Sequence, residues 1–348
     1  MFGKNLKYYR LKKDMTKKDL ADACGLTSMA ISNYESGKRM PDMAMIKRMA
    51  DVLDIYVVDF LDSRNMDLEF KHCEFRKNTK LTKSQQEFVR ESVEEYFSRF
   101  FDAIDCLGGN PLCDPIKCHT LSLSENYQDN ALTLREHLHL SPTGPVDELV
   151  ATLENLSILV FEIEVINDAF CGMNGTVNNY PYIVINKKMR AERKRTTIAH
   201  ELAHIMFDWS SISDSDQERM ATEIAGAFLI SNDDLIRELG QKRTRLTKDL
   251  NMVCEEYGIS MYQLIMRARQ ANIVSESFAK EFYIYANKAK WKQNEPNRVL
   301  KAEQPLLFKQ LVCRAVNEEG ISIQRGAELL NIPTSELNDY CGLLEVYA

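Results

Sequence analysis

The pattern His200-Glu201-Leu202-Ala203-His204 restricts most strongly what this 348-residue chain can fold into. Side chains four residues apart share one face of an α-helix, so a helix here brings both imidazoles together. Imidazole nitrogens are ordinary zinc ligands, and Glu201 is placed to touch water beside the metal rather than the metal itself. The plainer alternative is a core histidine at position 200 with His204 facing solvent.

A catalytic zinc site takes three protein ligands, so a third must come from elsewhere in the chain. Glu218 is the candidate, because it follows a loop over 208–214 and begins the next predicted helix. Thr222, one turn later, is a candidate hydrogen-bond partner for a ligand. Ser215-Asp-Gln-Glu218 also matches a capping box, so a capping role for Glu218 stays open.

Residues 181–231 resemble the ImmA/IrrE family of bacterial and phage metallopeptidases. The resemblance rests on a strand ending in asparagine (PYIVIN), an arginine-rich approach, the HExxH pattern and the helix ERMAT. It implies a gluzincin-like zinc metallopeptidase domain with His200, His204 and Glu218 as ligands and Glu201 as the catalytic residue. Tyr180 and Tyr182 are candidate donors to the oxyanion of the reaction.

Two positions depart from this family, and neither is a ligand. The chain has Thr222 where the family has asparagine, and Ser231 where proline is usual. The resemblance extends more loosely over about 70–345, including Phe75-Arg76-Lys77 and the stretch YGISMYQL from position 257.

The N-terminal 60 residues show the local signals of short, capped helices. Thr16 followed by Asp19 predicts a helix start, Gly25 predicts its end, and Thr27 is a natural N-cap for the next helix. Residues 16–41 resemble the XRE family of lambda-repressor-like helix–turn–helix domains. The marks are Leu20-Ala21, Gly25-Leu26-Thr27, Ile31-Ser32, Glu35, Gly37, Arg39 and Pro41.

This second resemblance implies binding to double-stranded operator DNA, with the third helix in the major groove. The residues that would face bases are Ser28, Met29 and Asn33. Those that would contact phosphates are Lys17, Thr27, Lys38 and Arg39. Lys17 stands where glutamine is common, which alters a contact expected there. A helix–turn–helix used only for protein pairing is the alternative.

Charge is unevenly distributed and favours DNA as the partner of the N-terminal part. Residues 1–41 carry nine basic and four acidic side chains, a net +5 in a chain of −7, which leaves −12 for the rest. A positive module suits a phosphate backbone. The basic run 187–195 is also compatible with nucleic acid, but we favour a solvated approach to the zinc helix.

Composition favours a folded cytoplasmic protein. Hydrophobic residues make up 45% of the chain, and no apolar run approaches the ~18 residues of a membrane span. The basic N-terminus lacks the apolar core of a signal peptide. Nine scattered cysteines are typical of reduced thiols rather than of a secreted disulfide framework. We expect a bacterial, phage or mobile-element protein with no membrane partner.

The expected fold is mostly α with a small β-sheet (α+β). Alternating apolar residues predict strands over 157–165 and 182–185, with a turn near 172–179. The stretch 319–333 has a second helix–turn–helix rhythm. The predicted parts are a helix–turn–helix domain (1–62), a helical linker region (63–128), an ImmA/IrrE-like metallopeptidase domain (129–290) and a helical C-terminal region (291–348).

Together these features predict a DNA-binding transcriptional regulator with a zinc metalloendopeptidase domain. The resemblance implies cleavage of a helix–turn–helix repressor, which would derepress mobile-element or stress genes. The alternative is a metal- or ligand-sensing transcription factor whose peptidase-like domain cuts nothing. A homodimer is compatible with either reading of the sequence.

Overall fold

The computed structural model describes residues 1–62, 64–65, 67–72, 81–165, 167, 169–291, 295, 300 and 302–342. The part of the chain that the structure describes is mostly helical with four short strands, as expected for the α+β class. Contacts divide the chain into two compact units: Met1–Pro111 with Val165–Phe170 and Leu307–Ala348, and Leu112–Glu164 with Cys171–Leu306. The domain boundaries expected from the sequence stay predictions. None of the described helices is long and apolar enough to cross a membrane.

The first unit begins with a five-element helical bundle whose caps were predicted from the sequence. Thr16 and Asp19 form a complete capping box, Gly25 ends the helix in the left-handed conformation at φ 69°, and Thr27 caps the next helix. These local predictions are confirmed. The elements are α1 (Phe2–Lys12), α2 (Lys17–Cys24), α3 (Ser28–Glu35), α4 (Met43–Leu53) and the 3₁₀ turn η1 (Val57–Phe60).

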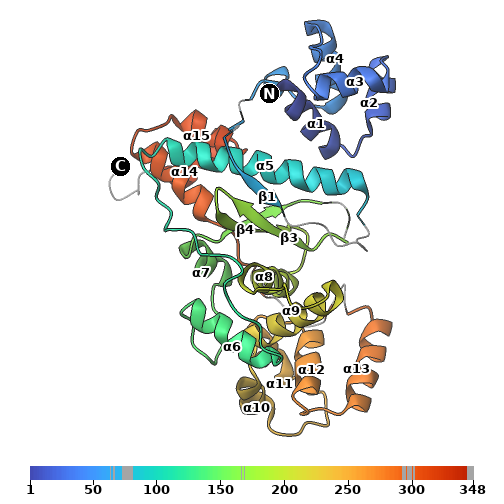
Figure 1. Ribbon diagram of the computed structural model, residues 1–348, viewed down its shortest axis with the longest axis vertical. Coiled ribbons are helices and arrows are strands. Elements are labelled where there is room, and N and C mark those ends of the chain that lie inside the picture. Colours follow the sequence, from blue (N-terminus) through green and yellow to red (C-terminus); the bar gives the residue numbers. More distant parts are fainter. Residues whose placement is uncertain are drawn as a thin grey trace. The chain divides into compact units, whose positions relative to one another are not determined.

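The long helix α5 (Lys83–Asp105) packs against this bundle; the short strand β1 (Phe70–His72) precedes it in the chain (Figure 1). The Lys7 ammonium lies 2.6 Å from a Glu87 carboxylate oxygen and 2.9 Å from one of Glu91. The Tyr8 and Phe88 rings stack with their centroids 6.4 Å apart. The N-terminal bundle is therefore fastened to α5 by charge and by aromatic packing.

Of the last three described helices, the first two contact α5 and the third packs on those two; together they contain a second helix–turn–helix. They are α14 (Leu307–Asn317), α15 (Ile323–Leu330) and α16 (Thr334–Cys341). Like α2 and α3, helices α15 and α16 have eight residues each, joined through a left-handed cap, here Asn331 at φ 54°. The helix–turn–helix rhythm expected over 319–333 is confirmed.

In the second unit, β4 (Tyr180–Asn186) is flanked by two strands of opposite direction. It pairs in parallel with β2 (Leu159–Ile163) and antiparallel with β3 (Gly172–Val177). The turn expected near 172–179 is wrong for most of that range, because β3 occupies it. The hairpin turn is Asn178-Asn179, whose φ values of 48° and 68° suit asparagine.

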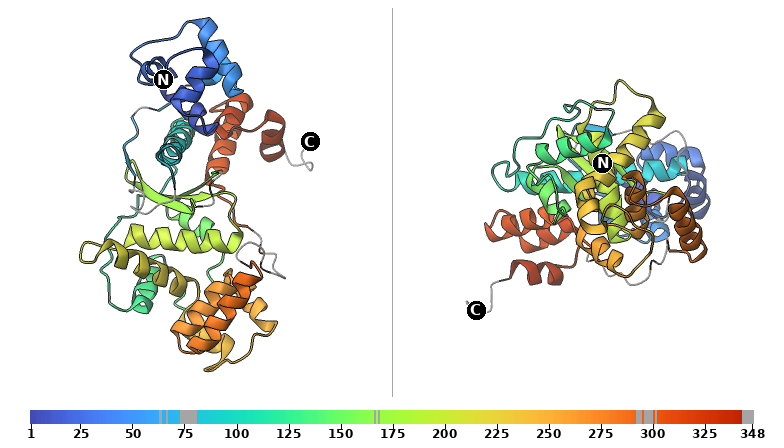
Figure 2. Two further views of the ribbon diagram at one scale, coloured as in Figure 1. Left: turned by 90° about the vertical axis from the view of Figure 1, so that its right-hand side faces the viewer. Right: turned by 90° about the horizontal axis from the view of Figure 1, so that it is seen from below.

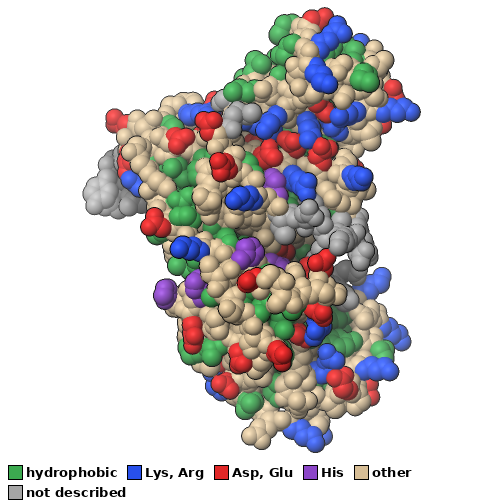
Figure 3. Space-filling model, viewed as in Figure 1, with side chains coloured by type: hydrophobic (Ala, Val, Ile, Leu, Met, Phe, Trp, Pro, Cys, Tyr) green, Lys and Arg blue, Asp and Glu red, His purple; other side chains and the backbone are tan. Residues whose placement is uncertain are grey.

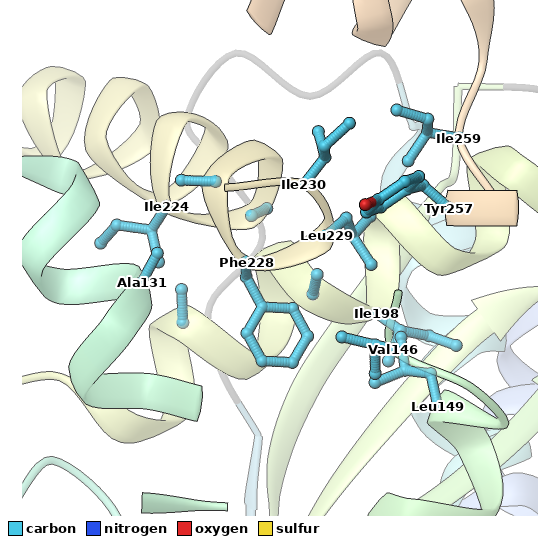
Figure 4. Packing of buried hydrophobic residues seen from close by; sticks show 14 of the residues in the cluster. Ala131, Val146, Leu149, Ile198, Ile224, Phe228, Leu229, Ile230, Tyr257 and Ile259 are labelled. Carbon is cyan, nitrogen blue, oxygen red and sulfur yellow. The ribbon is translucent and has the colours of Figure 1, made fainter. Parts of the chain in front are cut away.

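Helix α8 (Ala191–Met206) packs between β3 and β4 on one side and α9 (Asp214–Leu229) on the other (Figure 2). The predicted zinc helix is thus buried on two sides. Figure 4 shows side chains of the core around it, including Ile198 from α8 and Ile224 and Phe228 from α9. The surrounding helices are α6 (Tyr127–His137), α7 (Leu149–Asn155), α10 (Asn232–Leu239), α11 (Asp249–Tyr257), α12 (Met261–Gln270) and α13 (Glu276–Lys288).

Two buried arginines satisfy carbonyl groups at the C-terminal end of α9. The guanidinium of Arg135 donates to the Phe228 carbonyl oxygen at 2.8 Å, and Arg267 donates to the Ile230 carbonyl oxygen at 3.3–3.4 Å. Burial lowers the pKa of both guanidiniums. The last carbonyls of a helix have no partner within it, so these contacts fix the direction of α9.

We predict that Gly3→Ala destabilises the N-terminal bundle. A Cβ at Gly3 would lie 2.4 Å from the Glu35 carbonyl oxygen and 2.5 Å from that of Tyr34, and backbone atoms cannot rotate away. We expect a loss of about 1–3 kcal/mol, measured as faster amide hydrogen exchange in α1 and α3 of the full chain. Gly109→Ala, where a Cβ meets nothing within 4 Å, is the control. Equal exchange in the two variants would contradict this packing.

Candidate metal centre and nucleic-acid interface

His200, His204 and Glu218 converge on one point between α8 and α9. The two Nε2 atoms of the histidines lie 3.2 Å apart. The Glu218 carboxylate oxygens lie 3.4 Å from Nε2 of His200 and 3.6 Å from Nε2 of His204. Within the described part of the chain, this is the one group of three or more such side chains that could hold a metal ion.

The spacing of these three donors fits a small tetrahedral cation. Zinc bonds of about 2.0–2.1 Å arranged as a tetrahedron hold neighbouring ligand atoms about 3.3 Å apart. The two histidine nitrogens lie 3.2 Å apart, and they lie 3.4 and 3.6 Å from different oxygens of the Glu218 carboxylate, close to that value. Two imidazole nitrogens and one carboxylate oxygen also form a donor set that zinc favours. The residues therefore fit zinc in chemistry and in spacing.

Thr222 holds the His200 ring in the orientation that the cluster requires. Its hydroxyl donates to the Glu218 carbonyl oxygen at 2.8 Å and lies 3.4 Å from Nδ1 of His200. A hydroxyl engaged as a donor can accept from Nδ1–H, which leaves the Nε2 lone pair directed at the cluster. Threonine can thus take this role at the position where the ImmA/IrrE pattern has asparagine.

The backbone of His204 is held by Trp209, which lies just beyond the end of α8. The indole Nε1–H of Trp209 donates to the His204 carbonyl oxygen at 3.2 Å, and the two rings lie 5.2 Å apart between centroids. The side chain of Trp209 is 8% exposed. Its packing orders the turn between the two ligand-bearing helices.

The Glu201 carboxylate has a partner that the sequence did not indicate. Nδ2 of Asn174 donates to Oε2 of Glu201 at 2.7 Å, and both side chains are buried. Asn174 lies in β3, in the segment expected to be a turn. An asparagine within a Gly-rich stretch is typical of turns, and the pairing of β3 with β4 that places it here is not a local signal.

Two alternatives left open by the sequence are wrong. Helix α9 is capped by Ser213, whose hydroxyl accepts from the Asp216 amide, so Ser215 and Glu218 do not form a capping box. Tyr182 pairs with Gly175 across the hairpin, on the face opposite Asn174. Tyr180, two residues earlier, shares that face, so neither tyrosine faces α8 as an oxyanion donor would.

The basic run 187–195 is largely engaged in contacts within its own unit. Lys194 pairs with Glu162 at 2.6 Å, Lys188 pairs with Glu164 at 3.0 Å, and Arg195 pairs with Glu303. Lys194 and Arg195 are buried. The solvated approach expected from the sequence is therefore wrong for these two side chains, and their ion pairs also argue against a nucleic-acid surface. Phe75-Arg76-Lys77 lie outside the described residues.

The N-terminal bundle exposes most of the side chains that the resemblance implies for DNA. Ser28, Met29, Lys38 and Arg39 are exposed, and Asn33 is half-buried in α3. The Thr27 hydroxyl caps α3 by accepting from the Ala30 amide. Figure 3 shows lysine and arginine side chains dispersed among acidic ones over these helices.

Several basic groups counted in the sequence already have acidic partners. Lys17, an expected phosphate contact, lies 3.4 Å from a Glu35 oxygen and 3.3 Å from the Ser32 hydroxyl. Arg10 and Glu35 form a buried ion pair at 2.5 Å that ties α1 to α3. Lys7, paired with α5, is likewise less available. The net +5 therefore overstates the charge that can meet DNA.

Comparison with known families divides the chain in the same way as its motifs. Residues 6–60 match the model described as Helix-turn-helix, and residues 154–269 match the one described as IrrE N-terminal-like domain, of the M78 peptidases. The chain carries both domains. The IrrE-like domain contains the cluster of His200, His204 and Glu218.

Two curated relatives, both named HTH-type transcriptional regulators, match short stretches of the chain. One is an uncharacterized HTH-type transcriptional regulator, YqaE, of Bacillus subtilis, 38% identical over 55 residues, or 16% of this chain and 47% of that protein. The other is an SPbeta prophage-derived uncharacterized HTH-type transcriptional regulator of the same organism, YonR, 34% identical over 61 residues, or 18% of this chain and 56% of that protein. The chain thus spans about half the length of these relatives. No solved structure matches it.

We predict that the full chain binds about one zinc ion. His200→Ala and His204→Ala should abolish binding, and Glu218→Ala should weaken it at least about tenfold, because each removes one donor from the cluster. Glu201→Gln should leave zinc content unchanged. The measurement is metal analysis after dialysis, with competition against a chelator.

The matched control is His139→Asn, at an exposed histidine outside the cluster. Asparagine tolerates the positive φ of 58° at that position. Zinc affinity in Glu218→Ala equal to that of the control would remove Glu218 from the ligand set.

Proposed function

We propose that the chain is a DNA-binding regulator whose IrrE-like domain is a zinc endopeptidase. The observation that carries this proposal is the spacing of His200, His204 and Glu218, with the Glu201 carboxylate one residue from the first ligand. A pure metal sensor has no need of a buried glutamate next to its ligands. The competing proposal, a sensor that cuts nothing, predicts no effect of removing that carboxylate.

In the proposed hydrolysis, the metal would serve as the Lewis acid and the glutamate as the general base and acid. A zinc ion held by these three side chains would act as a Lewis acid on a scissile carbonyl and on water. Glu201 takes the proton of the attacking water and delivers it to the leaving amine. A carbon–oxygen bond forms as the peptide carbon–nitrogen bond breaks, and the products are a carboxylic acid and an amine. Burial of the site between α8 and α9 strengthens these electrostatic effects.

The proposed substrate is a protein, namely a helix–turn–helix repressor. Support comes from the resemblance to ImmA/IrrE proteins and from the helix–turn–helix domain joined to the IrrE-like domain. The relatives of the N-terminal domain are named transcriptional regulators, and one is prophage-derived. We propose that this chain acts in the bacterial cytoplasm on DNA of similar origin, where cleavage of the repressor would release silenced genes.

We propose that α3 of the helix–turn–helix domain enters the major groove of an operator. Ser28, Met29 and Asn33 would face bases, while Lys38 and Arg39 would contact phosphates. Thr27 would also approach a phosphate while capping the helix. Lys17 would contact a phosphate only if its ion pair with Glu35 broke. Homodimers would suit a palindromic operator.

We predict that Glu201→Gln abolishes cleavage of the helix–turn–helix repressor proposed as substrate. The change keeps size and polarity but removes the proton acceptor, so zinc content should survive and operator binding should stay within about twofold. Cleavage is followed on gels with the zinc-loaded full chain. The double variant Asn33→Ala with Arg39→Ala is the reciprocal control, and it should cut free repressor at the wild-type rate. Unchanged regulation in cells carrying Glu201→Gln would favour the sensor.

DNA binding by the full chain should weaken steeply with salt. Arg39→Ala should lower affinity for all sequences alike and reduce the log–log salt slope by about one, because one phosphate contact is lost. Asn33→Ala should instead reduce the preference for the operator over other DNA. Lys13→Ala is the control, since Lys13 is paired with Asp54 at 3.2 Å. Identical slopes in the Arg39 and Lys13 variants would exclude the phosphate contact.

A further inference from the structure

The Asn174 side chain joins the sheet of the second unit to the glutamate of the HExxH pattern. Its Nδ2 lies 2.7 Å from Oε2 of Glu201, and the two side chains are only 8% and 7% exposed. A buried charge-assisted hydrogen bond of this length restricts the direction of the carboxylate. It holds one of the two oxygens of that carboxylate.

The strand is built to bring this asparagine close to α8. Asn174 pairs with Ile183, which packs in the same core as Ile198, so its side chain shares the face of the sheet that meets the helix. Two residues earlier, a Cβ at Gly172 would lie 2.7 Å from Cγ2 of Thr197 and 3.3 Å from Cγ of Glu201. The missing side chain allows the strand to approach closely enough for a short amide to reach the carboxylate.

An unrestrained carboxylate at this position has another place to go. Carboxylate oxygens are good zinc ligands, and Glu201 directly follows the ligand His200. A catalytic site keeps one coordination position open for water or substrate, and a second carboxylate could fill it. In the described residues, the ligand cluster contains Glu218 but not Glu201.

We propose that Asn174 is a positioning residue that holds the Glu201 carboxylate off the cation and directed at the scissile bond. This inference rests on the proposed peptidase function. Its first consequence, a change in the coordination of the metal ion, can be observed without any cleavage of substrate. Without Asn174, the Glu201 carboxylate swings onto the metal and fills the open position. Both the coordination of the ion and the rate of the reaction then change.

The decisive test uses the full chain loaded with cobalt(II), whose visible absorption reports its ligands. Asn174→Ala should shift the cobalt spectrum relative to wild type. Adding Asn174→Ala to Glu201→Gln should cause no further shift, because the amide of glutamine is a poor ligand. Thr176→Ala, on the same face of β3, is the control and should keep the wild-type spectrum. If Asn174→Ala folds poorly, Asn174→Ser replaces it in the test. Its hydroxyl is too short to reach Glu201, so the same shift of the cobalt spectrum is expected.

The kinetic arm separates positioning from substrate binding. With the zinc form, Asn174→Ala should lower kcat about 10–100-fold while KM and zinc content stay within about twofold of wild type. An unchanged cobalt spectrum in Asn174→Ala and Asn174→Ser overturns the proposal whatever the kinetics show. If wild type cleaves nothing, the peptidase function fails, whereas the cobalt comparison still decides the role of Asn174.

Discussion

The burial of α8 on two sides is the constraint on which the rest of the second unit depends. Ile198, Leu202 and Ile205 are fully or almost fully buried, because α8 packs between the sheet and α9. Burying a polar side chain in such a helix costs free energy unless the side chain has a polar partner. His200 and His204 do so with Glu218 of α9, and Glu201 does so with an asparagine of the sheet.

The orientation of α9 depends on contacts at the end remote from the cluster. Its C-terminal carbonyls are bound by Arg135 of α6 and Arg267 of α12. Gly226 makes room for the second arginine, since a Cβ there would lie 2.8 Å from Cδ of Arg267. These two arginines lie on either side of Glu218 in the sequence, and one of them lies outside the matched segment 154–269. The geometry of the metal residues is thus maintained by a larger part of the chain than its motif.

The features that the sequence predicted are those decided by local hydrogen bonds and helical periodicity. Thr16, Gly25 and Thr27 each act on a backbone group within a few residues, and the structure confirms all three caps. The same turn chemistry recurs at Gly258 with Ser260 and again at Asn331. The α+β class and the helical pairing of two histidines followed from the same kind of evidence.

The features that the sequence missed depend on partners far along the chain. Strand β3 lies where the sequence predicted a turn near 172–179, and its pairing with β4 decides otherwise. The basic count of residues 1–41 favoured DNA, although Lys7 is paired with carboxylates of α5 about 80 residues away. A count of charged side chains cannot show which of these side chains is already paired with an opposite charge. For the same reason, the charge that the helix–turn–helix domain presents depends on α5 as well as on its own residues. Replacing Glu87 with glutamine would remove one of the two carboxylates at Lys7 without changing α3.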